Sequence, residues 1–253
     1  MSETVLELTA PALITDPDDI PIIEIDHLIT EDDTPVDNIL SERQMRLITD
    51  PLYASWPGPG DNRPFVAMTN VALYATPHED PLVPDALISL DVELPTDLMQ
   101  KAHRSYFLWE YGKPPDVVIE IVSNKKGREA GYKMRQYARL RVWYYVIFDP
   151  AYYLSKQLLR VYKLHSGQYQ LVENHWLSEL GLGLTVWYGT YEGARDTWWL
   201  RWCDEQGQML PTKEENMVQA NHRAEQERQR AEQERQRAER LAARLRAMGI
   251  EEE

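Results

Sequence analysis

Apolar residues occur along this chain in short runs with the length and composition of β-strands. The strongest run, Val117 to Val122, is rich in β-branched residues and is interrupted by one acid, Glu120. A second run, Val142 to Phe148, combines aromatic and β-branched residues. Other segments expected to form strands are 65–75, 82–90, 105–110, and a hairpin of 158–164 with 169–172.

Two segments have the pattern of helices. Ser41 is expected to cap a helix through 42–48, and 131–140 has helical spacing of its apolar residues. The order of these elements predicts an α/β fold with a mixed sheet and a helix against one face. Two late strands, 184–188 and 197–202, are expected to place their tryptophans over a sheet edge.

The C-terminal segment follows a heptad repeat. The unit that starts at Ala224 recurs unchanged from Ala231, and a diverging unit starts at Ala238. Glu227 and Glu234 interrupt its alanine-rich seam, so both a long single helix held by Glu/Arg pairs and a weak coiled coil stay open. Association into a homo-oligomer, through the core or through this tail, also stays an open hypothesis.

Charge is distributed unevenly along the 253 residues, whose net charge is -14. Residues 1–37 hold eleven acids and no lysine or arginine, with several prolines, which is typical of a flexible or draped arm. Seven bases lie between Lys125 and Arg141, which is either a positive patch for a polyanion or a solvated helix face. We therefore expect an acidic arm (1–37), one α/β domain (38–210) and a charged helical tail (211–253).

Several function classes are excluded by composition. The sequence has no apolar run long enough for a transmembrane helix and no secretory signal pattern, so we expect a cytoplasmic protein without a membrane partner. Cys203 is the single cysteine, which excludes an intrachain disulfide and a zinc site with several cysteines. Phosphate-binding glycine loops, nucleophile elbows and H-E-x-x-H pairs are also missing from the sequence.

Two carboxylates are the best candidates for chemistry. Asp85 opens the strand expected in 82–90, and Glu120 lies inside the strongest apolar run, where a charge needs a partner. Two oxygen donors at a sheet end are suited to Mg²⁺, and a nearby lysine could orient a metal-bound water. The residues alone leave simpler roles open, with Asp85 as a turn residue and Glu120 as half of a structural ion pair.

Four stretches together resemble the bacterial Uma-two family of restriction endonucleases. They are Pro84-Asp85, the run Pro-Asp-Val-Val-Ile-Glu-Ile-Val-Ser from Pro115, the Lys-x-x-x-Tyr pattern from Lys133, and Val-Trp-Tyr-Tyr-Val-Ile-Phe-Asp-Pro from Val142. The resemblance covers roughly Asp37 to Asp204. It implies a three-layer α/β fold of the restriction-endonuclease-like, PD-(D/E)xK type, with a mixed sheet flanked by helices.

The resemblance also implies roles for individual residues. Asp85 is similar to the motif aspartate and Glu120 to the acid of E-x-K, but Val122 occupies the place of the motif lysine. Lys133 on the following helix is then expected to replace this lysine, with Lys125 as its competitor. Glu42 resembles the supporting acid that many such nucleases place on the first helix.

The resemblance leads to two hypotheses from different classes. The first is an endonuclease that cleaves DNA with Mg²⁺ or Mn²⁺ bound by Asp85, Glu120 and the carbonyl of Ile121. In this hypothesis Lys125, Lys126 and Arg128 contact DNA phosphates, which carry no sequence information. The second is a non-catalytic binding or regulatory module with a nuclease fold, assembled through the tail. Val122 favours the second hypothesis, and the retained acids with Lys133 favour the first.

Overall fold

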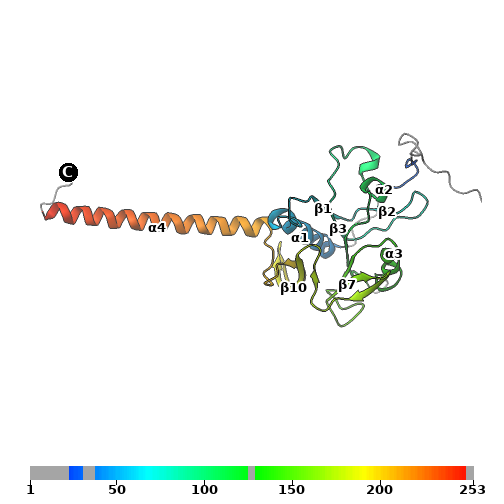
Figure 1. The fold of residues 1–253 in the computed structure, drawn as a ribbon. Coiled ribbons are helices and arrows are strands. Elements are labelled where there is room, and N and C mark those ends of the chain that lie inside the picture. Colours follow the sequence, from blue (N-terminus) through cyan, green and yellow to red (C-terminus); the bar gives the residue numbers. More distant parts are fainter. Residues whose placement is uncertain (1–22, 31–37, 125–128, 249–253) are drawn as a thin grey trace, which may run out of the picture.

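The computed structural model describes residues 23–30, 38–124 and 129–248. An α/β body packs around a central sheet, and one long helix projects away from it (Figure 1). Of the expected acidic arm, residues 23–30 are described, and Leu28 packs there with Tyr74 and Phe107. The remainder of the arm lies outside the described residues.

The central sheet has six strands in the order β1-β3-β5-β6-β7-β8. Neighbouring strands pair antiparallel except β5 with β6, which are parallel, so the predicted mixed sheet is confirmed. Every residue of β3, β5 and β6 is buried, as expected for strands covered on both faces. The strands are β1 (Phe65–Thr69), β3 (Ala86–Leu90), β5 (Val117–Ile121), β6 (Tyr144–Phe148), β7 (Leu159–His165) and β8 (Gln168–Leu171).

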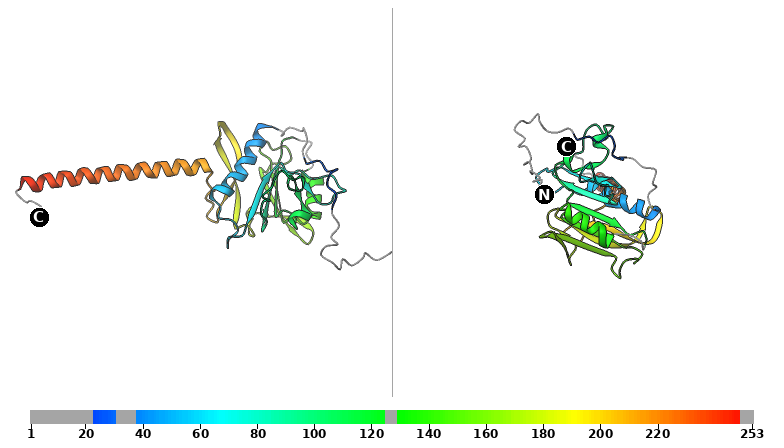
Figure 2. Two further views of the ribbon diagram at one scale, coloured as in Figure 1. Left: turned by 90° about the horizontal axis from the view of Figure 1, so that it is seen from above. Right: turned by 90° about the vertical axis from the view of Figure 1, so that its right-hand side faces the viewer.

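One face of the central sheet is covered by helix α1 (Ile39–Ser55) and by a second antiparallel sheet. The order of this sheet is β11-β10-β9, and Figure 2 shows both elements on the same side. Gln44 of α1 ties the layers together, because its amide pairs with the backbone N–H and C=O of Leu200. The strands are β9 (Trp176–Leu177), β10 (Leu182–Tyr191) and β11 (Ala194–Cys203).

The opposite face of the central sheet is covered by helix α3 (Met134–Arg139), which follows a π-helical turn (Glu129–Lys133). Tyr137 of α3 packs there with alternate residues of the central strands. The parallel pair of β2 (Leu73–Tyr74) with β4 (Tyr106–Phe107) also contributes to this layer. Two short helical segments complete the body, a 3₁₀ turn (Lys101–His103) and α2 (Leu108–Tyr111).

Some predicted elements were wrong in detail. The segment 65–75 is broken at Asn70, whose φ is 52°, and its end pairs with β4 outside the central sheet. The segment 105–110, which was expected to form a strand, is helical from residue 108. This helix ends at its C-cap Gly112, whose φ of 71° is readily adopted by glycine. Asn38 rather than Ser41 caps α1, because the Asn38 side chain accepts the N–H of Ser41 at 2.9 Å.

The late tryptophans were also predicted wrongly. Trp199 and Trp202 are fully buried instead of covering an edge. The indole of Trp202 packs in the core between the two sheets and donates to the carbonyl of Ile48 at 2.8 Å. The strand that carries both of them, β11, therefore helps to build a layer of the fold.

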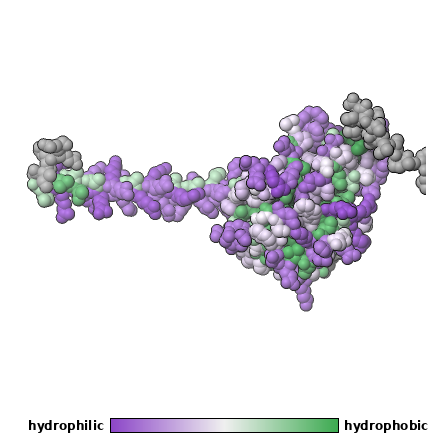
Figure 3. Space-filling model, in the orientation of Figure 1, coloured by the Kyte–Doolittle hydropathy of each residue, from purple (hydrophilic) through white to green (hydrophobic). Residues whose placement is uncertain are grey.

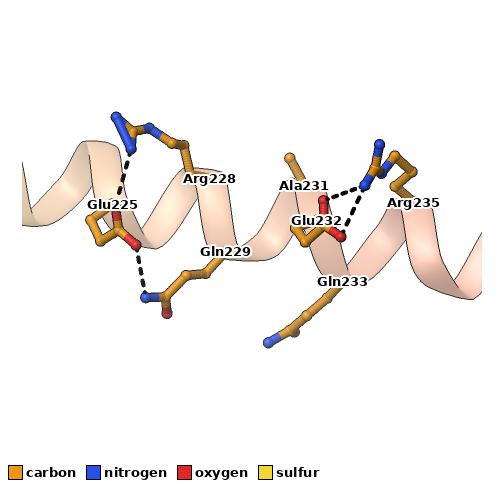
Figure 4. Close-up of a pocket in the computed structure, with 7 residues that line it drawn as sticks. All are labelled: Glu225, Arg228, Gln229, Ala231, Glu232, Gln233 and Arg235. Atoms are coloured by element: carbon orange, nitrogen blue, oxygen red, sulfur yellow. Dashed lines mark hydrogen bonds and ion pairs between the residues drawn. The ribbon is translucent and has the colours of Figure 1, made fainter.

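The heptad segment forms one helix, α4 (Lys213–Ala247), in which no described residue is buried. It is hydrophilic over most of its length, with apolar side chains near its far end (Figure 3). Glu225 contacts Arg228 and Gln229, and Glu232 contacts Arg235, along one helix (Figure 4). This is the single-helix arrangement, and coiled-coil association stays a prediction. Among the described residues, no helix combines the length and apolar character needed to cross a bilayer.

The base of α4 is fastened to the body. Thr212 and Glu215 form a capping box, and Glu215 also pairs with Arg201 of β11 at 2.7 Å. The Arg201 side chain is 1% exposed. Burial acts to raise the pKa of Glu215, but hydrogen bonds from Arg201 and Thr212 outweigh it and lower the pKa. The helix is therefore held by its first turn.

A truncation that ends at Met217 should keep the thermal midpoint and cooperativity of the full chain, because it retains this first turn. In contrast, Glu215→Gln should lower the free energy of unfolding by about 2 kcal/mol, because buried Arg201 loses its charged partner. Denaturant melts of both proteins check this. Loss of the cooperative transition in the truncation would show that the distal helix packs on the body.

Candidate active site

Glu120 lies in the middle of β5, and its side chain is 1% exposed. Residues of β5 alternate between the two faces of the sheet, and those on either side of it, Ile119 and Ile121, face the core under α1. Glu120 therefore faces the layer of α3, with Val118 and Val122. A carboxylate at this position requires polar partners from that layer.

Asp85 lies beside Glu120 on the neighbouring strand. The antiparallel register pairs Ala86 with Ile119, so Asp85, the residue before β3, faces Glu120 across the strands. One Asp85 oxygen accepts the backbone N–H of Ile121 at 2.6 Å. This hydrogen bond holds the Asp85 carboxylate in place just before the start of β3. The strand pairing thus brings the two predicted acids together on one face.

Lys133 and Tyr137 reach Glu120 from the helical layer. They are four residues apart, so they project from one side of successive helical turns. The Lys133 ammonium contacts one oxygen of Glu120 at 2.6 Å, and the Tyr137 hydroxyl donates to the other at 2.8 Å. Sequence reasoning used Tyr137 only as part of a family pattern and missed this contact, although its spacing from Lys133 was a usable signal.

The charge on Glu120 is unfavourable in this environment. Burial, together with the nearby Asp85 charge, raises the pKa of Glu120 to about 8, even though the Lys133 ammonium and the Tyr137 hydroxyl act to lower it. Burial also raises the pKa of Tyr137, so this residue stays a hydrogen-bond donor. A divalent cation beside Glu120 would favour its ionised form.

The donor set fits a hard divalent cation. Mg²⁺ takes one or two carboxylates and retains waters, and Asp85 and Glu120 supply two carboxylates on one face. No group of three or more His, Cys, Asp or Glu with metal-site geometry occurs among the described residues.

Other predicted site residues are placed differently. The structure does not bring Glu42 to this site, since α1 covers the opposite face of the sheet and Glu42 pairs with Arg46 at 2.8 Å. Val122 is buried among apolar side chains and offers no charged group. Lys125, Lys126 and Arg128 lie outside the described residues.

On the other face of the sheet, Glu179 also contacts a lysine and a tyrosine. Comparison with this residue shows how burial changes the pKa of Glu120. Glu179 contacts Lys163 at 2.6 Å and accepts a hydrogen bond from Tyr144. Burial acts to raise the pKa of Glu179, but hydrogen bonds from Lys163, Tyr144 and Ser178 lower it to about 2. Glu179 is thus a satisfied, partly exposed ion pair, and it offers a matched control for Glu120.

The raised pKa of Glu120 should appear in the stability of the metal-free protein. With a folded pKa of about 8 against an ordinary 4.5, its contribution is complete below pH 4.5 and is lost as pH rises to 8. In EDTA, the wild type should lose up to about 1.4 kcal/mol per pH unit relative to Glu120→Gln. Chemical denaturation across this range measures the difference, and Glu179→Gln should keep the wild-type slope. Parallel curves for wild type and Glu120→Gln would contradict the assignment.

Comparison with known families is consistent with this geometry. The sequence profile of the Uma2 family, described as "Putative restriction endonuclease", matches residues 29–187, which is more than half of the chain. The match includes the whole central sheet and α3, and it ends before the expected limit at Asp204. No curated protein matches the chain. The description indicates a nuclease, and the mixed sheet between helical layers agrees with a restriction-endonuclease-like fold. The chain belongs to the Uma2 family.

Proposed function

We propose that this protein is an endonuclease that hydrolyses DNA phosphodiester bonds with Mg²⁺ or Mn²⁺. The observation that carries the proposal is the buried carboxylate of Glu120 beside Asp85, with Lys133 in contact. A strongly raised pKa at a charged cluster is typical of functional sites. The family description supports the same class of reaction.

Asp85, Glu120 and the carbonyl of Ile121 are the proposed ligands of the metal ion. A divalent ion at this position would activate a water molecule and offset negative charge on the phosphate. The hydrogen bond from the N–H of Ile121 to Asp85 holds the start of β3 against β5. It therefore sets the distance between the proposed ligands. Because β3 and β5 lie inside the sheet and are buried along their length, this spacing is rigid.

Lys133 is the proposed positioning group for the attacking water. Its side chain is 27% exposed, so the ammonium can contact solvent as well as Glu120. Its positive charge would also stabilise the charge that develops on the phosphate. Tyr137 holds the second oxygen of Glu120 from within the core. Lys125, Lys126 and Arg128 are proposed to contact DNA phosphates, and such contacts position DNA without reading its sequence.

A second candidate function is a non-catalytic module with a nuclease fold. Both oxygens of Glu120 already have partners, Lys133 and Tyr137, as in a structural ion pair. Val122 at the position of the motif lysine points the same way. In that case the projecting helix α4 would serve assembly with a second copy or a partner.

Catalysis is tested by removing charge while keeping shape. With Mg²⁺ or Mn²⁺, Glu120→Gln, Asp85→Asn and Lys133→Met should each lower the rate of plasmid cleavage by about 100-fold or more, because each removes a charge from the reacting centre. Initial rates of conversion of supercoiled to nicked and linear DNA give the measurement. Far-ultraviolet circular dichroism of each variant shows whether the fold is kept.

Glu179→Gln is the matched control and should keep the wild-type rate, because Glu179 lies on the other face of the sheet. Wild-type protein that cleaves neither DNA nor RNA with either ion, and binds neither ion, supports the non-catalytic module instead. Cleavage that survives Glu120→Gln would place the active site elsewhere.

A further inference from the structure

Arg160 lies on the same face of the sheet as the candidate active site. It occupies the second position of β7, between Leu159 and Val161, which both face the core under α1. Because residues alternate along a strand, Arg160 faces the layer of α3, as Glu120 does. No sequence motif singled out this residue.

The strand register places Arg160 in one row with the acids. Glu120 pairs with Ile147 across β5 and β6, and Ile147 pairs with Arg160 across β6 and β7. Two strand spacings separate the backbones of Arg160 and Glu120 by about 10 Å. The buried side chain of Ile147 faces the same layer between them, so an anion held by Arg160 would lie beside the candidate metal site with Ile147 in between.

The Arg160 guanidinium is incompletely satisfied. Its Nε and Nη2 atoms are buried and have no hydrogen-bond partner within the part of the chain that the structure describes. Buried donors without partners are costly, so each one in a native protein calls for an explanation. The buried guanidinium of Arg201 also has an Nε without a partner among the described residues, but both of its terminal nitrogens pair, with Glu215 and with the carbonyl of Leu210.

The nearby carboxylate of Asp149 is engaged elsewhere. Asp149 follows β6 directly, and its two oxygens accept three backbone N–H groups of the next loop, at 2.7 to 3.2 Å. These amides belong to Tyr153, Leu154 and Ser155. This set of bonds orders the loop. Arg160 as a whole is partly exposed, so a turn of its flexible side chain toward solvent would let an external anion satisfy these two nitrogens.

We propose that Arg160 binds a phosphate group of the nucleic acid at this site. Arginine suits this role because its planar guanidinium donates two parallel hydrogen bonds to phosphate oxygens. The assignment of this anion as a DNA phosphate rests on the proposed nuclease function. The existence of an anion site at Arg160 rests only on the row of strands and the unsatisfied nitrogens.

Arg160→Met tests the proposal, because it removes the charge and keeps an apolar stem. Lys163→Met is the matched control, since Lys163 lies on the same strand, faces the other side and pairs with Glu179. DNA binding is measured over a series of salt concentrations with Ca²⁺ in place of Mg²⁺, which separates binding from cleavage. Arg160→Met should weaken binding about tenfold or more. It should also reduce the slope of log affinity against log salt by about one unit, because one phosphate contact is lost. Lys163→Met should leave this slope unchanged.

Thermal melts provide an independent readout that needs no DNA. Without ligand, Arg160→Met should melt at or above the wild-type temperature, because two buried donors without partners are removed. Inorganic phosphate should raise the melting temperature of the wild type and of Lys163→Met by more than that of Arg160→Met.

The outcomes separate this inference from the proposed function. If the wild type binds and cleaves DNA, but Arg160→Met has the affinity and salt slope of Lys163→Met, the role of Arg160 is overturned and the nuclease proposal stands. If the wild type cleaves no DNA, yet phosphate stabilises it and not Arg160→Met, the nuclease proposal falls and the anion site stands. A melting temperature that drops in Arg160→Met, with equal phosphate stabilisation in both proteins, shows a purely structural arginine.

Discussion

A carboxylate in the middle of a fully buried strand is the constraint on which the candidate site depends. Glu120 has lost its contact with water, so it must obtain charge and hydrogen bonds from the layer that packs on it. Lys133 and Tyr137 supply them from successive turns of one helical segment. The contacts with Glu120 therefore help to hold this helical segment over β5. The same contacts form both part of the fold and the candidate site.

The rest of the architecture makes this arrangement rigid. Two apolar cores enclose the central sheet, one under α1 and the second sheet, the other under α3. The acids of the candidate site therefore project from strands that cannot shift without disturbing both cores. The contrast with Glu179 shows the effect of location, because a similar set of partners gives a pKa of about 2 at that partly exposed glutamate and about 8 at Glu120. Depth of burial decides which carboxylate is poised to take up a proton or a cation.

Sequence reasoning predicted the parts of the fold and site that follow from local patterns. Short apolar runs rich in β-branched and aromatic residues identified the central strands, and an acid in such a run identified Glu120. The approach of Asp85 to Glu120 required that their two strands be neighbours. Asp85 faces Glu120 because of an antiparallel register that no local pattern specifies.

Arg160 was missed for the same reason, since its place in the row depends on two further strand pairings. The second sheet was missed because its tryptophans are recognisable as core residues only when Gln44 and Ile48 of α1 lie beside them. Glu42 was assigned by resemblance alone, and its helix packs on the other face.

In the proposed site, the Glu120 carboxylate that Lys133 contacts binds a divalent metal ion together with Asp85. Diffraction from crystals grown with Mn²⁺ tests it most directly, because anomalous scattering locates this ion without assumption. We expect an anomalous peak about 2 Å from oxygens of both Asp85 and Glu120, with the Lys133 ammonium displaced from Glu120. Crystals saturated with Mn²⁺ that show no peak there, and in which Lys133 still contacts Glu120, would show that these carboxylates form no metal site.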